Sequence, residues 1–217
     1  GLLGTAVDQD CTLELSQLSF PRYLECLDEP FSQEEIWEAV KCMPARKAPD
    51  PDGFTAEFLR SCWPIVKHDY VRVFQQLYAL RGRGFSCLNQ ALITLLPKRA
   101  DANGLGDYRP ISLIHLVTKI FAKVLSLHLA PKLCSRVNTC QNAFIPSWSL
   151  HDNFILVRQS ARLLHQLGAP RVLLKLDLAR AFDTISWPFL FEVLQQYGFG
   201  SCFHGMARHL ALLVSMK

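Results

Sequence analysis

Apolar positions recur at helical spacing through most of this chain, and short apolar runs that suit strands are few. Ser32, followed three residues later by Glu35, has the form of a capping box, and Ile36 and Val40 then fall on one helix face. Pro44 is expected to end this first helix. The pattern predicts further helices over residues 55–62, 64–81, 116–133, 151–167, 187–197 and 200–215.

Two apolar runs predict strands. Residues 91–96 form the first, which Pro97 closes, and residues 172–176 form the second, a buried strand that ends at Asp177. Two prolines and a glycine within residues 47–54 indicate a turn. Residues 1 to about 30 are expected to be irregular, with a polar start typical of a connector. The fold class that follows is α/β (α+β) and helix-rich.

Composition narrows the picture only slightly. The chain has 217 residues, is 50% hydrophobic and carries a net charge of +4, which suits one domain or two small ones. A mildly basic balance is compatible with nucleic acid without demonstrating it. No uncharged apolar run reaches the length of a membrane span, and no signal segment is visible, so we expect a piece of a longer intracellular protein, nuclear or cytoplasmic. The oligomeric state is left open.

The cysteines point away from zinc and from a disulfide framework. Eight of them are scattered along the chain without any C-x-x-C pair, whereas zinc sites use closely spaced ligand pairs. We expect most of these thiols to be reduced and buried.

Asp177 is the strongest candidate in the chain for a chemical role. A carboxylate at the end of a core strand carries a large desolvation cost unless a cation or hydrogen bonds meet it. A divalent metal shared with phosphates would meet that need, and so would a cap on the following turn. A phosphatase-like nucleophile would require a second acid two residues later, where Ala179 stands. The residues alone leave the metal ligand and the cap both open.

Five blocks in order carry a resemblance to a known family. They are LPKR at 96–99, DYRPISL at 107–113, QNAFIP at 141–146, HDN at 151–153 and LKLDLARAFD at 174–183. Together they resemble the reverse transcriptases of non-LTR (LINE-type) retrotransposons, closest to those of plants, from about residue 32 to residue 217.

The resemblance implies the fingers and partial palm of a right-hand polymerase. It implies an N-terminal connector over 1–31, a fingers-like helical region over 32–169 and the start of the palm over 170–217. The implied reaction is attack of a DNA primer's 3′-hydroxyl on a deoxynucleotide triphosphate, directed by an RNA template and assisted by two Mg²⁺ ions.

The same resemblance assigns roles at the metal and template ends of the site. Asp177 matches the catalytic, metal-ligating aspartate, and the backbone carbonyl of Leu178 would be a further metal ligand beside the nucleotide. Phe182 matches the aromatic beneath the nucleotide sugar, where a bulky ring leaves no room for a 2′-hydroxyl. Gln141 and Phe144 match a block that helps to hold the template.

Two cations are assigned to the incoming triphosphate. Arg109 resembles the fingers arginine, whose guanidinium pairs bidentately with phosphate oxygens. Lys98 resembles a second phosphate contact. Tyr108 and Pro110 would fix the loop that presents Arg109.

Several positions depart from the family pattern. Asp50 replaces the first glycine of the usual turn, Ser147 and Trp148 replace Gly-Arg, and His128 replaces an arginine, which dilutes a cation at neutral pH. No adjacent Asp-Asp pair occurs in the 217 residues, so the family's second metal-binding block is absent from them. One carboxylate cannot hold two divalent ions, so we expect this polypeptide alone to be inactive. The alternatives are a non-catalytic nucleic-acid-binding remnant and a non-functional relic.

Overall fold

The computed structural model describes residues 24–47, 51–81, 90–133, 149–168 and 185–214, together with positions 83, 88, 137, 141, 172, 174 and 176. Its helices and strands run in the order η2 (Glu25–Asp28), α1 (Gln33–Lys41), α2 (Ala56–Ala79), β1 (Ala91–Pro97), η4 (Leu105–Asp107), β2 (Tyr108–Ile114), α3 (Leu116–Leu133), α4 (Leu150–Gln166), α5 (Trp187–Gln196) and α6 (Ser201–Val214). This mixture of helices with a small sheet confirms the predicted helix-rich α+β class.

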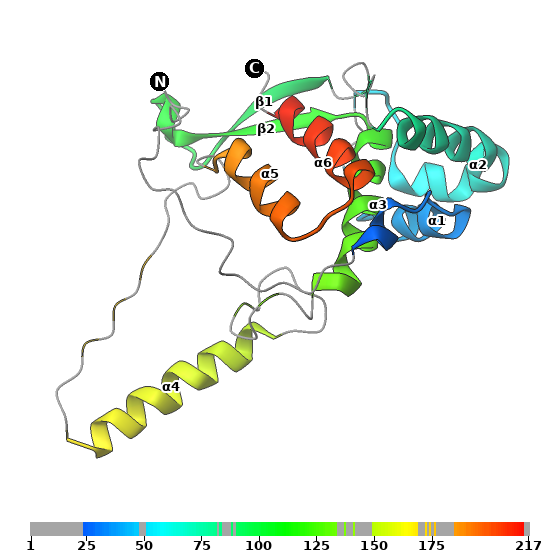
Figure 1. Cartoon of the computed structure of the whole chain (residues 1–217). Helices are drawn as coiled ribbons and strands as arrows, with labels where there is room; N and C mark the ends of the chain where they lie inside the picture. The colour runs from blue at the N-terminus through cyan, green and yellow to red at the C-terminus, as the bar shows by residue number, and fades with distance from the viewer. Residues whose placement is uncertain are drawn as a thin grey trace.

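The helices α1, α2 and α3 lie side by side and form one end of the structure (Figure 1). The antiparallel hairpin β1–β2 extends away from them, and α4 projects away from both groups (Figure 1). The helix α6 contacts α5, η2 and α2. The core lies between η2, α1, α2, α3 and α6. Its largest fully enclosed side chains include Phe74, Phe121, Ile36 and Met206. The arrangement therefore leaves the hairpin as an arm that protrudes from a helical body.

The local signals of α1 are confirmed. The Ser32 hydroxyl accepts a hydrogen bond from the Glu35 backbone N–H at 3.1 Å, and the Ser32 N–H donates to the Glu35 carboxylate at 2.8 Å. This reciprocal pair satisfies two backbone donors that the first helical turn would otherwise leave unpaired. Ile36 and Val40 are fully buried on the same face, as their spacing predicted.

The helix α2 differs from the prediction, because the expected break at Pro64 does not occur. Pro64 lies inside one continuous helix, although it removes a backbone donor there. Packing beside the proline compensates, and the rings of Trp63 and Tyr70, one on each side of Pro64, lie 5.8 Å apart. Trp63 is buried and stacks on Trp37 with ring centroids 5.2 Å apart, and the Arg60 guanidinium donates to the Lys41 carbonyl at 3.1 Å. Contacts with α1 therefore hold the part of α2 before Pro64 in place.

The later part of the expected irregular segment belongs to the core instead. Leu24 and Leu27 are almost completely buried around η2. The Asp28 carboxylate accepts hydrogen bonds from the backbone N–H groups of Cys202 at 3.2 Å and Phe203 at 2.7 Å, in the first turn of α6. The Tyr78 hydroxyl of α2 donates to the Asp28 carbonyl at 2.5 Å. Contacts far apart in sequence thus fasten η2 to α2 and α6.

The buried strand expected before Asp177 is wrong for its described positions. Val172, Leu174 and Leu176 have no regular structure and are 94%, 74% and 78% exposed. A strand needs a neighbour to accept and donate its backbone hydrogen bonds, and in the described part of the chain only β1 and β2 pair as strands. Asp177 itself lies outside the described residues.

Most of the other predicted helices and strands are present in the structure. The strand at 91–96 and the helices beginning near 116, 151, 187 and 201 are confirmed as β1, α3, α4, α5 and α6. The end of α5 follows the expected glycine signal, because Gly198 adopts a φ of 79°. The burial expected for most thiols is wrong among the four described cysteines, since only Cys202 is buried and Cys42 is exposed.

Candidate functional site

The hairpin β1–β2 sets the position of the two cations assigned to the triphosphate. Its register places Leu96 opposite Arg109 and Pro97 opposite Tyr108. Residues opposite one another in an antiparallel pair project to the same face, so Arg109 shares a face with Leu96. Lys98, two positions beyond Leu96, continues that alternation, and its N–H donates to the Asp107 carbonyl at 2.7 Å. Backbone pairing alone therefore brings Lys98 and Arg109 to the same end of the hairpin.

The expectation that a loop presents Arg109 is wrong, because residues 108–114 form the strand β2. Pro110 is accommodated because, among the described residues, β2 pairs with a strand on one edge only, so its missing N–H costs no ladder bond on the other edge. Arg109 is exposed on this strand. A strand holds its backbone more firmly than a loop would, which makes Arg109 a preorganised cation.

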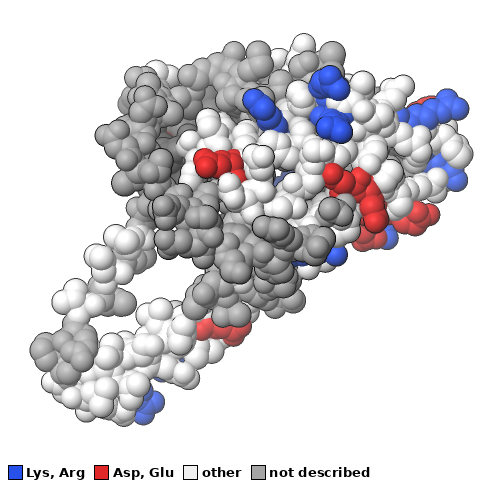
Figure 2. All heavy atoms as spheres, viewed as in Figure 1, with Lys and Arg blue, Asp and Glu red and all other residues white. Residues whose placement is uncertain are grey.

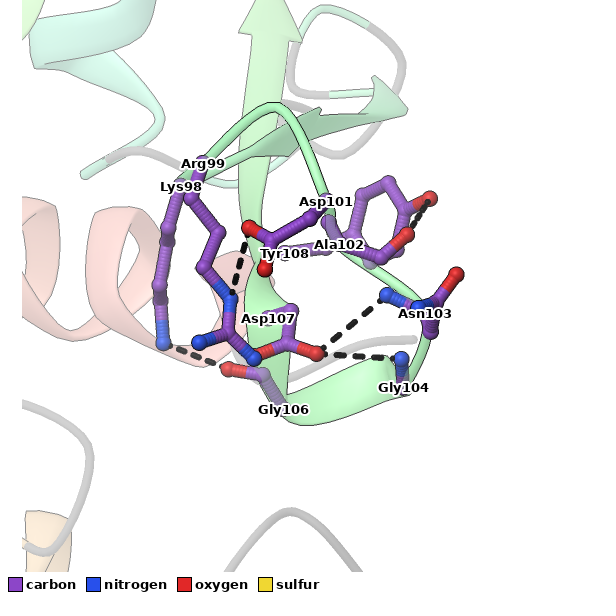
Figure 3. A network of polar contacts seen from close by, with 9 residues as sticks. All are labelled: Lys98, Arg99, Asp101, Ala102, Asn103, Gly104, Gly106, Asp107 and Tyr108. Carbon is purple, nitrogen blue, oxygen red and sulfur yellow. Dashed lines mark hydrogen bonds and ion pairs between the residues drawn. The ribbon is translucent and has the colours of Figure 1, made fainter.

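A polar network closes the tip of the hairpin (Figure 3). The Asp107 carboxylate accepts from the backbone N–H groups of Gly104 at 3.1 Å and Asn103 at 3.3 Å, and pairs with the Arg99 guanidinium at 3.0 Å. Arg99 also lies 3.4 Å from Asp101. Hydrogen bonds from the N–H groups of Gly104 and Asn103 lower the pKa of the Asp107 carboxyl below its ordinary value; desolvation opposes them, and Arg99 and Lys98 lower this pKa further. Asp107 is thus a charged anchor for the whole tip.

Lys98 is engaged within that tip. Its ammonium donates to the Gly106 carbonyl at 2.7 Å, beside the Arg99–Asp107 pair (Figure 3). The acceptor is neutral, so an anionic phosphate could compete for the same ammonium. Sequence reasoning did not single out Arg99 or Asp107 as a pair. The signal available was a basic residue and an acid bracketing a short glycine-containing loop.

The structure leaves the metal end of the predicted site untested. Asp177, Leu178, Phe182 and Phe144 lie outside the described residues. Gln141 is described as an exposed residue without regular structure. Within the described ranges no three His, Cys, Asp or Glu side chains lie close enough to hold a metal ion. Of the predicted site residues, the described structure therefore brings together only Lys98 and Arg109, the candidates for phosphate binding. The binding of magnesium by Asp177 and Leu178 stays a prediction.

His128 has a role that the sequence did not reveal. Its Nδ1 lies 2.6 Å from the Glu35 carboxylate, its Nε2 lies 3.3 Å from the Cys26 carbonyl, and its side chain is only 11% exposed. Partial burial acts to raise the pKa of the Glu35 carboxyl, but hydrogen bonds from Ser32 and His128 outweigh it and hold that pKa below its ordinary value. His128 thus joins α3 to α1, and it is not presented to a phosphate.

A small hollow lies where the turn after α1 meets the beginnings of α2 and α3. It was not expected from the sequence, which indicated only a turn over 47–54. The residues that line it are Met43, Pro44, Lys47, Phe54, Thr55, Ala56, Leu116 and Lys119. Two lysines and a phenylalanine thus belong to the lining of one small hollow.

Charge of both signs is interspersed on the face shown in Figure 2, where Lys and Arg side chains lie near carboxylates. The net charge of +4 is therefore not gathered into one basic patch among the described residues of that face. No described helix is both long enough and apolar enough to span a bilayer. Binding of an anion would therefore depend on particular groups of basic side chains and not on the net charge of the protein.

Comparison with known proteins converges on one group. Residues 96–213 match the family described as reverse transcriptase (RNA-dependent DNA polymerase). The chain is 33% identical over 184 residues to the transposon TX1 uncharacterized 149 kDa protein of Xenopus laevis, covering 85% of this chain and 14% of that protein.

Two further relatives are polyproteins of retrotransposable elements. The retrovirus-related Pol polyprotein from type-2 retrotransposable element R2DM of Drosophila melanogaster is 26% identical, over 80% of this chain and 17% of its own length. The corresponding polyprotein from type-1 element R2 of Popillia japonica is 28% identical, over 78% of this chain and 22% of its own length. The chain thus spans less than a quarter of each of these relatives. All three come from animals, so the expected affinity to plant elements stays a prediction.

Proposed function

This chain belongs to the family of reverse transcriptases (RNA-dependent DNA polymerases), and we propose that it forms the fingers and the start of the palm of a non-LTR retroelement polymerase. The observation that supports this most directly is the hairpin register, which brings Arg109 and Lys98 together inside the matched region. Two cations at one exposed end suit a ligand with several adjacent negative charges, as a nucleoside triphosphate has.

In this proposal the two cations act in different ways. Arg109 offers a planar fork that pairs with two phosphate oxygens at once, and Lys98 acts as a point charge. Lys98 would exchange the Gly106 carbonyl for a phosphate oxygen, which is the stronger acceptor because it is charged. Asp107 would keep the tip ordered while this exchange takes place, because its bonds run to backbone groups and to Arg99.

The remaining roles are proposed from the family pattern. Asp177 and the backbone carbonyl of Leu178 would hold Mg²⁺, which supplies stabilisation of charge on the attacking and leaving oxygens. Phe182 would select deoxynucleotides, and Gln141 and Phe144 would contact the RNA template opposite a DNA primer. The intact polymerase would copy RNA inside the cell, in the nucleus or cytoplasm. The boundaries at 31 and 169 remain part of this proposal.

Nucleotide binding by the full 217-residue chain tests the proposal. We expect Arg109→Gln to weaken binding of a fluorescent deoxynucleotide triphosphate with Mg²⁺ by about tenfold or more, because a hydrogen bond to a charged group contributes about 1.5–3 kcal/mol. Arg109→Lys should fall between, since it keeps the charge and loses the fork. Arg72→Gln, an exposed arginine of α2, is the matched control. Equal affinity for all four proteins would refute the assignment.

A primer-extension assay tests the expected inactivity. A polypeptide of these 217 residues contains no adjacent Asp-Asp pair, so we expect no extension of a DNA primer on an RNA template with Mg²⁺. Extension by the purified polypeptide, lost on Asp177→Asn, would show that these residues suffice for the chemistry.

A further inference from the structure

The tip of the hairpin carries a third cation beside the two that the proposed function uses. Arg99 directly follows Lys98, and both side chains run from the end of β1 toward neighbouring residues (Figure 3). The Lys98 ammonium donates to the Gly106 carbonyl at 2.7 Å, and Nη2 of Arg99 lies 3.0 Å from the Asp107 carboxylate. The Lys98 ammonium also interacts electrostatically with that carboxylate. Two adjacent cations therefore lie within electrostatic reach of one carboxylate.

The two oxygens of the Asp107 carboxylate have different partners. Oδ2 accepts hydrogen bonds from the backbone N–H groups of Gly104 at 3.1 Å and Asn103 at 3.3 Å. Oδ1 is the oxygen that pairs with Arg99. One oxygen thus holds the loop at the tip and the other holds the guanidinium, so Arg99 can leave Asp107 without releasing the loop.

The ion pairs of Arg99 are exposed to water. The Arg99 side chain is 60% exposed, and its second partner, Asp101, lies 3.4 Å from Nε and is 77% exposed. Water and salt screen ion pairs of this kind, so the pairs contribute little to stability. A phosphate group presents charged oxygens that can pair with both arms of the guanidinium fork at once. A polyphosphate can therefore take Arg99 from its two carboxylates.

We propose that Arg99 is a third binding residue for the nucleoside triphosphate, and that Asp107 is an internal competitor which occupies Arg99 until the nucleotide binds. The inference rests on the proposed function, because Lys98 and Arg109 then contact the same triphosphate. Residues 98–109 contain three cations and two carboxylates. A triphosphate carries several adjacent charged groups, so one ligand can meet all three cations once Arg99 has exchanged its partner.

Two substitutions at this pair should change the nucleotide affinity of the full 217-residue chain in opposite directions. We expect Arg99→Gln to weaken binding of the fluorescent deoxynucleotide triphosphate with Mg²⁺ by about three- to tenfold, because hydrogen bonds to a charged group are lost. Asp107→Asn should tighten binding by about two- to fivefold, because an exposed carboxylate no longer competes for Arg99. The asparagine amide oxygen can still accept from the backbone N–H groups of Gly104 and Asn103, so the loop keeps its bonds.

A double-mutant cycle tests whether Asp107 acts through Arg99. Arg99→Gln/Asp107→Asn should bind the nucleotide as Arg99→Gln alone does, because the competitor has no effect once the guanidinium is gone. Inorganic tripolyphosphate, used to displace the fluorescent nucleotide, should give the same order of affinities, since the contact is with phosphates. Arg72→Gln and Asp69→Asn, which remove exposed charges from α2, are the matched controls and should bind as the wild type does. Equal thermal melting of the variants shows that the fold is retained.

Three results would overturn the inference. Binding of the triphosphate by Arg99→Gln at wild-type affinity would show that Arg99 makes no phosphate contact. A loss of affinity in Asp107→Asn that matches the loss in Arg99→Gln would show that the pair only maintains the shape of the tip. A gain in Asp107→Asn that persists in the Arg99→Gln background would show a general effect of charge in place of competition.

Arg109→Gln, measured in parallel, separates this inference from the proposed function. If Arg109→Gln weakens binding while Arg99→Gln does not, the proposed function stands and the third cation is wrong. If neither variant weakens binding, both are wrong.

Discussion

Replacement of Asp28 by alanine tests how the N-terminal segment is fastened to the last helix. Gly200 precedes α6, and its carbonyl accepts the helical hydrogen bond from His204 at 3.0 Å, so it occupies the N-cap position. Glycine has no side chain with which to cap. The Asp28 carboxylate fills the space instead, because a Cβ on Gly200 would lie only 2.1 Å from its Oδ2.

The magnitude follows from the bonds that are lost. Asp28→Ala removes an ionised acceptor from two first-turn donors, the N–H groups of Cys202 and Phe203. Loss of an N-cap costs about 0.5–2 kcal/mol, and hydrogen bonds to charged groups contribute about 1.5–3 kcal/mol. Asp28 is only partly buried, so water replaces some of this. We expect the free energy of unfolding to fall by about 2 kcal/mol, and by about half as much for Asp28→Asn.

Urea unfolding followed by circular dichroism measures the effect. The Tyr78 hydroxyl bonds to the backbone carbonyl of Asp28, which alanine retains, so Tyr78→Phe should add its own smaller loss. Asp69→Ala, an exposed aspartate of α2, is the matched control and should change stability by less than about 0.5 kcal/mol. If Asp28→Ala is no more destabilising than Asp69→Ala, the carboxylate does not cap α6 in solution and the reasoning fails.

Two further substitutions should change the free energy of unfolding in opposite directions. Pro64→Ala should raise the free energy of unfolding by about 1–3 kcal/mol, because it restores a backbone donor inside the continuous helix α2, and a loss of stability in urea would contradict that continuity. Glu35 has a lowered pKa in the folded protein, so its charge stabilises the fold above its ordinary pKa and that contribution disappears as the pH falls through the lowered value. Glu35→Gln should therefore be less stable than the wild type at neutral pH, with a difference that shrinks in urea titrations as the pH falls below the ordinary carboxyl pKa of 4.5, and a constant difference would refute the role of the charge.

The candidate site divides into a predictable and an unpredictable part. The strand at 91–96 could be predicted from its apolar run, and Lys98 and Arg109 could be chosen because the family blocks that contain them are strings of neighbouring residues. The pairing of Arg99 with Asp107 needed the hairpin to close before the two could meet. The hollow needed three segments to converge, and its lysines are 72 positions apart in numbering, from Lys47 to Lys119.

What the sequence alone determined about this protein is its local structure. The capping box of Ser32 and Glu35 acts across three residues, and the apolar faces of α1 and α3 repeat within each turn, so both operate before any tertiary contact exists. The family blocks are likewise strings of neighbouring residues.

Tertiary structure decided what distant residues do to one another. Trp63 packs on Trp37 of α1 and on Tyr70 beyond Pro64, Asp28 caps a helix 173 positions later at Ser201, and His128 meets Glu35. Val172, Leu174 and Leu176 show the reverse case, because they are exposed and no strand in the described part of the chain pairs with them. Local sequence specifies backbone conformations of low energy, whereas burial and hydrogen-bond satisfaction depend on partners that only the folded chain brings together.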